Sequence, residues 1–260
     1  MNRPAAVLIT GSSTGIGATY AARFAQRGHD LVLVARDKAR LDVLAQQLSE
    51  KFDVTVEVLP ADLTNQDDLL RVERKLRDDE RIGVLINNAG MGQSGSFLDQ
   101  DAQRIEQMIA LNVTSVTRLA AAIAPRLVNN GDGAIVNIGS VVGLAPEFSM
   151  SIYGATKSYV QFLSQGLQIE LGPRGVYVQA VLPAATRTEL WDRAGIDVSR
   201  LAEMMDVEEL VDAALVGYDR REPITIPPLH VEERWASLQT ARQALIGDLK
   251  QGQAAARYRQ

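Results

Sequence analysis

Short apolar runs alternate with longer amphipathic segments along almost the whole chain, and this alternation constrains the fold more than any other feature. Apolar runs bounded by turn residues are typical of strands covered on both faces, and the amphipathic segments between them are typical of crossover helices. Right-handed crossovers then predict an α/β fold, one doubly wound parallel β-sheet of about seven strands flanked by helices on both faces. We expect strands at 6–10, 31–35, 54–59, 84–87, 134–138, 176–182 and 223–226, and helices near 15–28, 38–51, 66–80, 101–128, 152–172, 207–218 and 231–246.

The length of 260 residues suits one sizeable core, and no repeat or linker divides the chain. We therefore expect a single domain over residues 1–260, in which 229–260 forms a C-terminal helical extension. In the expected terminal helix Trp235, Leu238 and Leu245 lie near one face. This segment either docks on a neighbour or covers the active site.

Charge and hydropathy exclude several classes of partner. The net charge is −5 and the isoelectric point about 5.2, so there is no basic stripe for nucleic acid and no sign of a membrane surface. No apolar run approaches the roughly 18 residues that span a bilayer. The start MNRPAAVLIT has no secretory cleavage pattern, so we expect a cytoplasmic protein.

Metal and thiol chemistry are disfavoured by composition. The chain has no cysteine, which excludes disulfides, thiolate metal sites and a cysteine nucleophile. Its two histidines, His29 and His230, are too few for most histidine-based metal sites, and we expect no metal. His230 is more simply a loop residue than a catalyst.

The stretch TGSSTGIG, from Thr10 to Gly17, admits two interpretations. Gly11, Ser13 and Gly15 spell the G-x-S-x-G elbow of α/β-hydrolases, but that elbow follows a central strand, whereas Ser13 follows the first. A glycine turn before a helix, whose backbone N–H groups and positive end hold the phosphates of a dinucleotide, suits this context better. The expected contacts are Gly11, Ser13, Thr14, Gly15, Ile16 and Gly17.

Further motifs follow in a fixed order: NNAG at 87–90, Asn112 in ALNV, Ser140 in NIGS, and Tyr153 and Lys157 in YGATK. Each alone has a plainer interpretation, since a serine after a strand is usually a helix cap and a buried asparagine is often structural. Together they resemble the short-chain dehydrogenase/reductase family, whose members have one Rossmann-type domain and a Y-x-x-x-K active site. The resemblance covers residues 5 to about 228.

The chemistry of these residues suits proton transfer. A phenol has a pKa near 10, and the ammonium of Lys157, on the same helix face as Tyr153, can favour the phenolate. Ser140 ends a strand and can hydrogen-bond a reacting carbonyl. Asn112 lies on an apolar helix stripe, where a buried amide requires partners.

The family resemblance implies a catalytic tetrad of Asn112, Ser140, Tyr153 and Lys157. In that tetrad the tyrosine is the general acid/base and the serine orients the substrate. The asparagine holds a water that links the lysine to solvent.

The end of the second strand indicates the cofactor. An acid there binds the ribose of NAD, whereas a nearby arginine accommodates the 2′-phosphate of NADP. The chain has Ala35 where NAD-dependent members of the resembled family carry the acid, and Arg36 where NADP-dependent members carry arginine. Asp37 follows and suits the N-cap of the next helix. We therefore expect NADP, with NADPH preferred over NADH.

The remaining cofactor contacts rest on the resemblance. It implies that Asp62 meets the adenine and Thr188 the nicotinamide carboxamide, although an aspartate before Leu-Thr-Asn is also a common turn residue. The family has Pro-Gly where this chain has Pro183-Ala184, and alanine is less free to take positive φ. The implied set is Asp62, Leu63, Asn88, Ala89, Gly90, Tyr153, Lys157, Pro183 and Thr188.

Three segments expected above the nicotinamide, 91–100, 141–152 and 184–206, are rich in methionine and large apolar residues. They contain Met91, Val142, Leu144, Phe148, Met150, Leu190, Trp191, Met204 and Met205. Such a lining suits an aldehyde or ketone with a hydrophobic body, or the matching alcohol, although part of it serves equally well as core or subunit interface.

Three functions follow. The first is an NADP-dependent carbonyl reductase, the second a 3-oxoacyl thioester reductase, and the third a non-catalytic NADP-binding regulator. The third is disfavoured because Tyr153 and Lys157 are both present. The resemblance also implies a homodimer or homotetramer, in which the helices at 101–128 and 152–172 pair between subunits.

Overall fold

The computed structural model describes residues 4–93, 96–189 and 203–259. The strands are β1 Ala6–Thr10, β2 Leu31–Ala35, β3 Val56–Pro60, β4 Ile82–Asn87, β5 Gly133–Ile138, β6 Val176–Val181 and β7 Ile224–Thr225. The main helices are α1 Gly15–Gln26, α2 Lys38–Phe52, α3 Gln66–Asp78, α4 Ala102–Ile109, α5 Val116–Asn130, α6 Ser151–Leu171, α8 Val207–Asp219 and α9 Glu232–Asp248.

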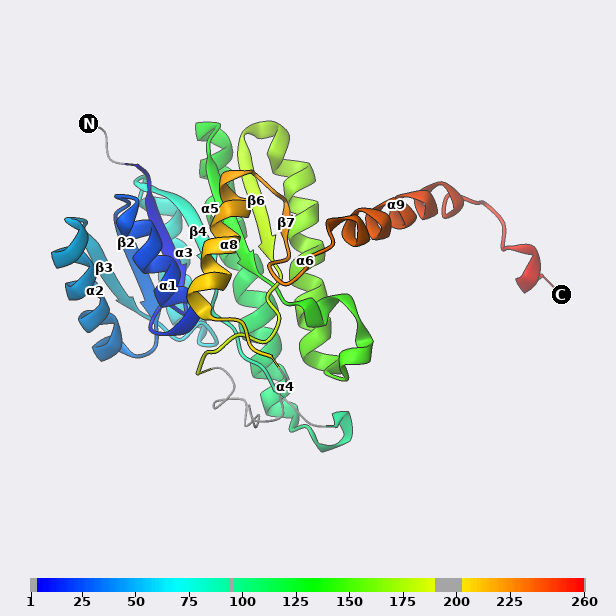
Figure 1. The fold of residues 1–260 in the computed structure, drawn as a ribbon, viewed down its shortest axis with the longest axis horizontal. Helices are drawn as coiled ribbons and strands as arrows, with labels where there is room; N and C mark the ends of the chain where they lie inside the picture. Colours follow the sequence, from blue (N-terminus) through cyan, green and yellow to red (C-terminus); the bar gives the residue numbers. More distant parts are fainter. Residues whose placement is uncertain (1–3, 94–95, 190–202, 260) are drawn as a thin grey trace. The chain divides into compact units, whose positions relative to one another are not determined.

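All seven strands are parallel and lie in the order β3-β2-β1-β4-β5-β6-β7 (Figure 1). The predicted α/β fold is therefore confirmed. Strand order reverses between β1 and β4, because the chain moves outward from β1 to β3 and then returns to the other side of β1. In open α/β sheets this switch point, at the carboxyl ends of the strands, is where a ligand binds.

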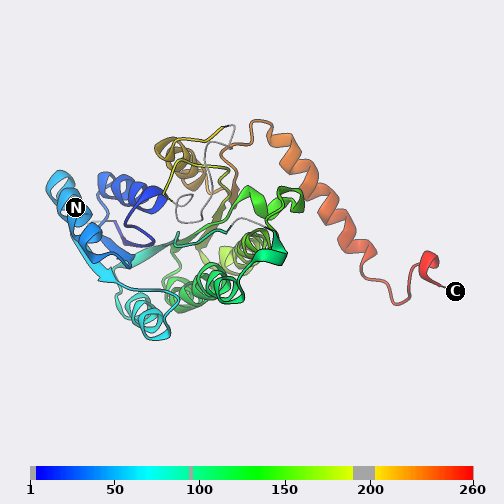
Figure 2. The same cartoon turned by 90° about the horizontal axis from the view of Figure 1, so that it is seen from below.

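Helices cover both faces of the sheet (Figure 2). One core lies between the sheet and α1, α2 and α8, with Tyr20, Leu41 and Val211 fully buried. The other lies between the sheet and α3 and α5, with Leu76 and Ile123 fully buried. Strands covered in this way must be apolar on both sides, which is why β1 and β2 are buried at every position.

The predicted helix at 101–128 is interrupted in the structure. It consists of α4, a π-helical turn at Ala110–Ser115, and α5. By length and composition alone, the whole segment Ala102–Asn130 is long and apolar enough to cross a membrane. The sequence expectation considered only uninterrupted apolar runs and did not indicate this segment. Leu119, Ile123 and Leu127 are buried in the core beneath the sheet, so packing within this fold accounts for their apolar character.

Contacts divide the chain into two compact units, Met1–Pro227 and Pro228–Gln260. The second unit contains α9 and a short 3-10 turn at Ala256–Tyr258. None of the residues of α9 is buried.

Candidate active site

The glycine turn between β1 and α1 is built from positions that tolerate no side chain. Gly11 and Gly15 have φ of +65° and +56°, where other residues are strained. A Cβ on Gly17 would lie 2.5 Å from the Nδ2 atom of Asn88, and one on Gly11 would lie 2.8 Å from Cα of Ala89. The turn therefore packs directly against the loop that follows β4.

Hydrogen bonds join the same two loops. The Nδ2 atom of Asn88 donates to the carbonyls of Thr10 at 2.9 Å and Gly11 at 3.0 Å. The Thr10 hydroxyl oxygen accepts from the backbone N–H groups of Asn88 and Ala89, both at 3.0 Å. The side chain of Asn88 thus holds the glycine turn. Sequence reasoning missed Thr10, although a hydroxyl at the last position of the first strand was its signal.

The start of α1 has the properties of an anion site. Ser13, Thr14 and Ile16 are half-buried at the turn, and the helix presents the positive end of its dipole to the cleft. Ser13 follows β1, the first strand of the chain, which is not the context of a hydrolase elbow. The ring of His29 lies beyond the other end of β1, where it hydrogen-bonds the Ala5 carbonyl at 2.7 Å.

Charged residues line the end of β2. Arg36 is exposed, and its guanidinium makes no hydrogen bond or ion pair with the described part of the chain. Asp37 caps α2 by accepting from the N–H of Arg40 at 3.1 Å, which confirms its expected role. The guanidinium of Arg40 pairs with Glu189 at 2.8 Å and so connects α2 to the loop after β6.

Asp62 and Leu63 follow β3. The Oδ1 atom of Asp62 accepts from the N–H and hydroxyl of Thr64 at 2.9 and 2.7 Å, so the plainer interpretation as a turn residue describes its local bonding. The side chain of Leu63 is buried in the core.

Tyr153 and Lys157 lie one turn apart on α6, and Ser140 follows β5 beside them. The Nζ atom of Lys157 is 5.7 Å from the centroid of the Tyr153 ring and donates to the Ile138 carbonyl at 2.8 Å. The Ser140 hydroxyl accepts from the N–H of Val142 at 3.2 Å and contacts the Pro183 carbonyl at 3.4 Å.

Burial dominates the proton affinities of this pair. It raises the pKa of Tyr153 to about 12, against a smaller lowering by the hydrogen bond with Ser140. It lowers the pKa of Lys157 to about 8, because a buried ammonium loses its hydration. Lys157 is not among the groups that shift the pKa of Tyr153, and its ammonium is directed at the Ile138 carbonyl. That Lys157 favours the phenolate stays a prediction.

Asn112 is buried in the π-helical turn and has three hydrogen bonds. Its Nδ2 atom donates to the Met91 carbonyl at 2.8 Å and to the Thr156 hydroxyl at 3.1 Å, while Oδ1 accepts from the Met91 N–H at 2.9 Å. Both amide protons are thus used within the protein. Thr156, which sequence reasoning missed, in turn donates to the Tyr153 carbonyl at 2.8 Å and so connects Asn112 to α6.

Gly90 marks the point where these side chains converge. A Cβ at this position would lie 3.3 Å from Oδ1 of Asn112 and 3.5 Å from Nζ of Lys157. Likewise, a Cβ on Gly92 would lie 3.8 Å from the ring of Tyr153. The loop after β4 therefore passes directly over the predicted tetrad.

The loop after β6 closes the other side. A Cβ on Gly15 would lie 3.1 Å from the Thr188 methyl group, so Thr188 lies against the glycine turn. The contact of Thr188 with the nicotinamide carboxamide, which the resemblance implies, stays a prediction. The Pro183 carbonyl accepts from the N–H of Val141 at 2.9 Å. Ala184 is not among the described residues with positive φ, so alanine is accommodated where the resembled family has glycine.

The predicted apolar lining is only partly described. Leu190 and Trp191 lie outside the described residues. The other members are half-buried or exposed: Met91, Val142, Leu144, Phe148, Met150, Met204 and Met205.

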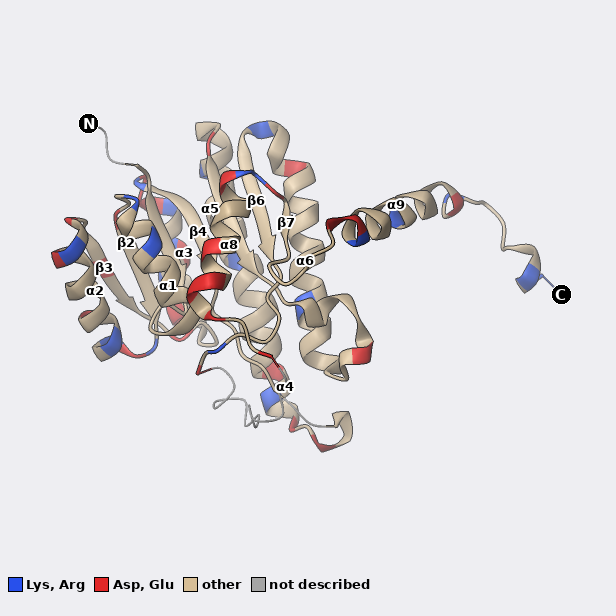
Figure 3. Ribbon diagram, viewed as in Figure 1, with Lys and Arg blue, Asp and Glu red and all other residues tan. Residues whose placement is uncertain are grey.

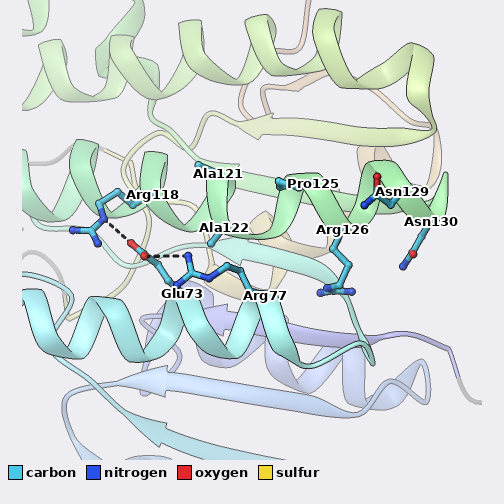
Figure 4. A pocket seen from close by; sticks show the side chains of 9 residues that line it. All are labelled: Glu73, Arg77, Arg118, Ala121, Ala122, Pro125, Arg126, Asn129 and Asn130. Carbon is cyan, nitrogen blue, oxygen red and sulfur yellow. Dashed lines mark hydrogen bonds and ion pairs between the residues drawn. The ribbon is translucent and has the colours of Figure 1, made fainter.

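A separate groove of about 550 Å³ lies between α3 and α5 (Figure 4). Its centre is the buried carboxylate of Glu73, which pairs with Arg118 at 2.5 Å and Arg77 at 3.4 Å. These bonds stay within the groove and join its two helices. Among the described residues no group of three His, Asp or Glu side chains could hold a metal ion.

Strand order and the glycine turn at the switch point together define a Rossmann-type dinucleotide-binding protein. The family model described as short chain dehydrogenase matches residues 5–198. The chain belongs to this family and is an oxidoreductase.

Several known proteins are similar to this chain. A solved short-chain dehydrogenase from Sphingobium yanoikuyae in complex with NADPH is 69% identical, with a TM-score of 0.97 over 98% of this chain and 100% of that one. The bulky-bulky ketone specific alcohol dehydrogenase from Comamonas testosteroni is 61% identical, with a TM-score of 0.92 over 99% of each chain. Human very-long-chain 3-oxoacyl-CoA reductase is 38% identical over 187 residues, which are 70% of this chain and 60% of that protein. The match thus spans well under two thirds of this curated relative.

Proposed function

We propose that this protein is an NADPH-dependent reductase of ketones with bulky hydrophobic substituents, also acting on the matching alcohols in reverse. The main support is its 61% identity, over 99% of both chains, to a bulky-bulky ketone specific alcohol dehydrogenase. The NADPH complex of the relative at 69% identity supports the cofactor.

The residues at the switch point are compatible with a dinucleotide. Side chains at Gly11 or Gly17 would collide with the neighbouring loop, and α1 begins at this turn. Such a turn lets backbone N–H groups approach a pyrophosphate closely. The exposed guanidinium of Arg36 would hold the 2′-phosphate, with Thr188 near the nicotinamide end.

A bound nicotinamide would supply the hydride that reduces the carbonyl carbon. In the proposal, the Ser140 hydroxyl holds the carbonyl oxygen, and the Tyr153 hydroxyl donates a proton to it. The raised pKa of Tyr153, about 12, keeps this proton in place until the oxygen becomes negative. Charged Lys157 then stabilises the phenolate that remains. Asn112 holds the Met91 loop over the site.

A 3-oxoacyl thioester reductase is the second candidate, supported by 38% identity to a very-long-chain 3-oxoacyl-CoA reductase. The bulky-ketone activity is favoured because the similarity to that relative is higher and covers the full chain. A non-catalytic regulator would not require the Tyr153 and Lys157 pair to be retained.

NADPH absorbance with a substrate panel separates these functions. We expect turnover of ketones with two bulky substituents, weaker turnover of small ketones, and loss of about 100-fold or more in Tyr153→Phe, the usual range for a general acid. Preference for 3-oxoacyl thioesters would favour the second candidate. NADPH binding without turnover of any carbonyl would leave only the regulator.

The proposal includes the organisation expected from the sequence. Residues 1–260 form one dinucleotide-binding and catalytic domain with a helical extension at 229–260, and the protein is a cytoplasmic homodimer or homotetramer. The absence of cysteine fits the reducing conditions of the cytoplasm.

A further inference from the structure

The helix α9 exposes an apolar stripe. Trp235, Leu238 and Leu245 form this stripe within the helix, Val231 and Leu249 continue it at the two cap positions, and Arg242 occupies the position between Leu238 and Leu245. Leu238, Leu245 and Leu249 are 51, 55 and 78% exposed, and Trp235 is half-buried. Such spacing is that of a coiled-coil seam, in which each apolar residue packs against a facing helix.

Arg242 occupies the middle of the stripe and determines which pairing is acceptable. Between two parallel copies in register, each Arg242 would face Arg242 of the partner subunit, and like charges would meet in the seam. Between antiparallel copies centred near residue 240, Arg242 instead faces Leu238 of the partner subunit. In the same register Trp235 faces Leu245 of the partner subunit.

The charges that flank the stripe agree with the antiparallel arrangement. Arg234 and Asp248 lie along one edge of the helix, and neither forms an ion pair with the described residues. Figure 3 shows that α9 carries both positive and negative residues. Antiparallel pairing brings Arg234 beside Asp248 of the partner subunit, and the two-fold axis repeats this opposite-charge pair. Parallel pairing would place Arg234 beside Gln239 of the partner subunit.

We propose that α9 is a self-association surface, on which α9 of a second copy of this chain packs antiparallel, with its centre near residue 240. Association buries the five apolar residues of the stripe and forms two Arg234–Asp248 pairs between subunits. The surface lies wholly within 228–260 and does not depend on the proposed activity.

Crosslinking tests the register directly, since the chain has no cysteine of its own. Ala241 lies on the edge shared with Arg234, next to the two-fold axis, whereas Thr240 lies on the side of α9 that faces away from the stripe. With a short bis-maleimide we expect Ala241→Cys to give a covalent dimer at least about five times as abundant as Thr240→Cys does, because only residue 241 lies beside its own copy in the paired helices. Both positions are exposed, so each variant should fold.

Charge reversal tests the proposed ion pair between Arg234 and Asp248 of the partner subunit. Added to Ala241→Cys, Arg234→Glu should reduce the dimer severalfold, and Arg234→Glu with Asp248→Arg should restore it. Equal crosslinking at 241 and 240 would overturn the proposal, as would no effect of charge reversal. Efficient dimer formation by Leu238→Cys but not by Ala241→Cys would indicate parallel pairing and also overturn it. No dimer from any variant would mean that α9 packs elsewhere.

Discussion

The ammonium of Lys157 lies 5.7 Å from the centre of the Tyr153 ring, yet its hydrogen bond goes to the Ile138 carbonyl at 2.8 Å. The lysine is therefore anchored to the end of β5, while the tyrosine is carried by the first turns of α6. Their relationship depends on how the helix packs against the strand. The same Nζ atom lies 3.5 Å from the position that a Cβ on Gly90 would take, next to Oδ1 of Asn112.

Lys157→Met should reveal the cost of burying this charge. The pKa of Lys157 falls from 10.5 to about 8 on folding, so between these pH values the unfolded chain binds a proton that the folded protein does not. The contribution of Lys157 to the free energy of unfolding is then lowest below pH 8 and rises by about 3 kcal/mol toward pH 10.5. The methionine variant lacks this rise. Urea unfolding of both proteins at pH 7 and pH 10 measures it, and a difference that is independent of pH would contradict the prediction.

Arg36→Ala should weaken NADPH selectively. If the exposed guanidinium binds the 2′-phosphate, its loss lowers the kcat/KM ratio of NADPH to NADH by about 10- to 100-fold, the range for a hydrogen bond to a charged group. Lys38→Ala is the matched control, because Lys38 is a nearby exposed cation already paired with Asp42 at 2.6 Å. An unchanged ratio in Arg36→Ala would remove this residue from cofactor recognition.

Gly17→Ala should be strongly destabilising, whereas Gly166→Ala should not. A Cβ at Gly17 meets Nδ2 of Asn88 at 2.5 Å, while a Cβ at Gly166 has nothing within 4 Å. We expect a loss of about 3 kcal/mol for Gly17→Ala from overpacking. The alanine at 166, inside α6, should gain up to about 1 kcal/mol from helix propensity. Chemical denaturation tests both, and a Gly17→Ala protein as stable as wild type would mean that the two loops can separate.

Thr156→Val should disturb Asn112 without changing the size of the side chain. The substitution removes the acceptor of one Asn112 amide proton and leaves that proton buried, at a cost of about 1–3 kcal/mol. A lower kcat should accompany it, because the same hydroxyl also bonds the Tyr153 carbonyl. Thr156→Ser keeps the hydroxyl and should stay close to wild type in both measurements. If valine and serine variants behave alike, the hydrogen bond has no such role.

Most of the fold could be predicted from local pattern. The bounds of β1 and β2 match the sequence expectation residue for residue, because turn residues follow each apolar run. The predicted start of β3 at 54 is two residues early, since Val54 is buried beside α2 but pairs with no strand. The π-helical turn at Ala110–Ser115 was not predicted, because its residues continue the helical pattern on either side.

The hydrogen bonds of the site could not be predicted in the same way as the fold, because they connect residues that are far apart in the sequence. Motifs identified Asn112, but its partners Met91 and Thr156 are 21 and 44 residues away. No local spacing predicts such bonds. The orientation of Lys157 toward Ile138, 19 residues earlier, is likewise a product of how α6 packs on β5.

The close contact of Gly17 with Asn88 has a consequence for how such a protein can change. The glycine turn has no room for a side chain at Gly11 or Gly17, so a substitution there would require the turn and the loop after β4 to move apart. The rim, with Arg36, Arg40 and Glu189, is exposed and charged. A change of nucleotide preference is therefore expected to arise at these rim residues. A mutant library designed to change the preference from NADPH to NADH should vary them.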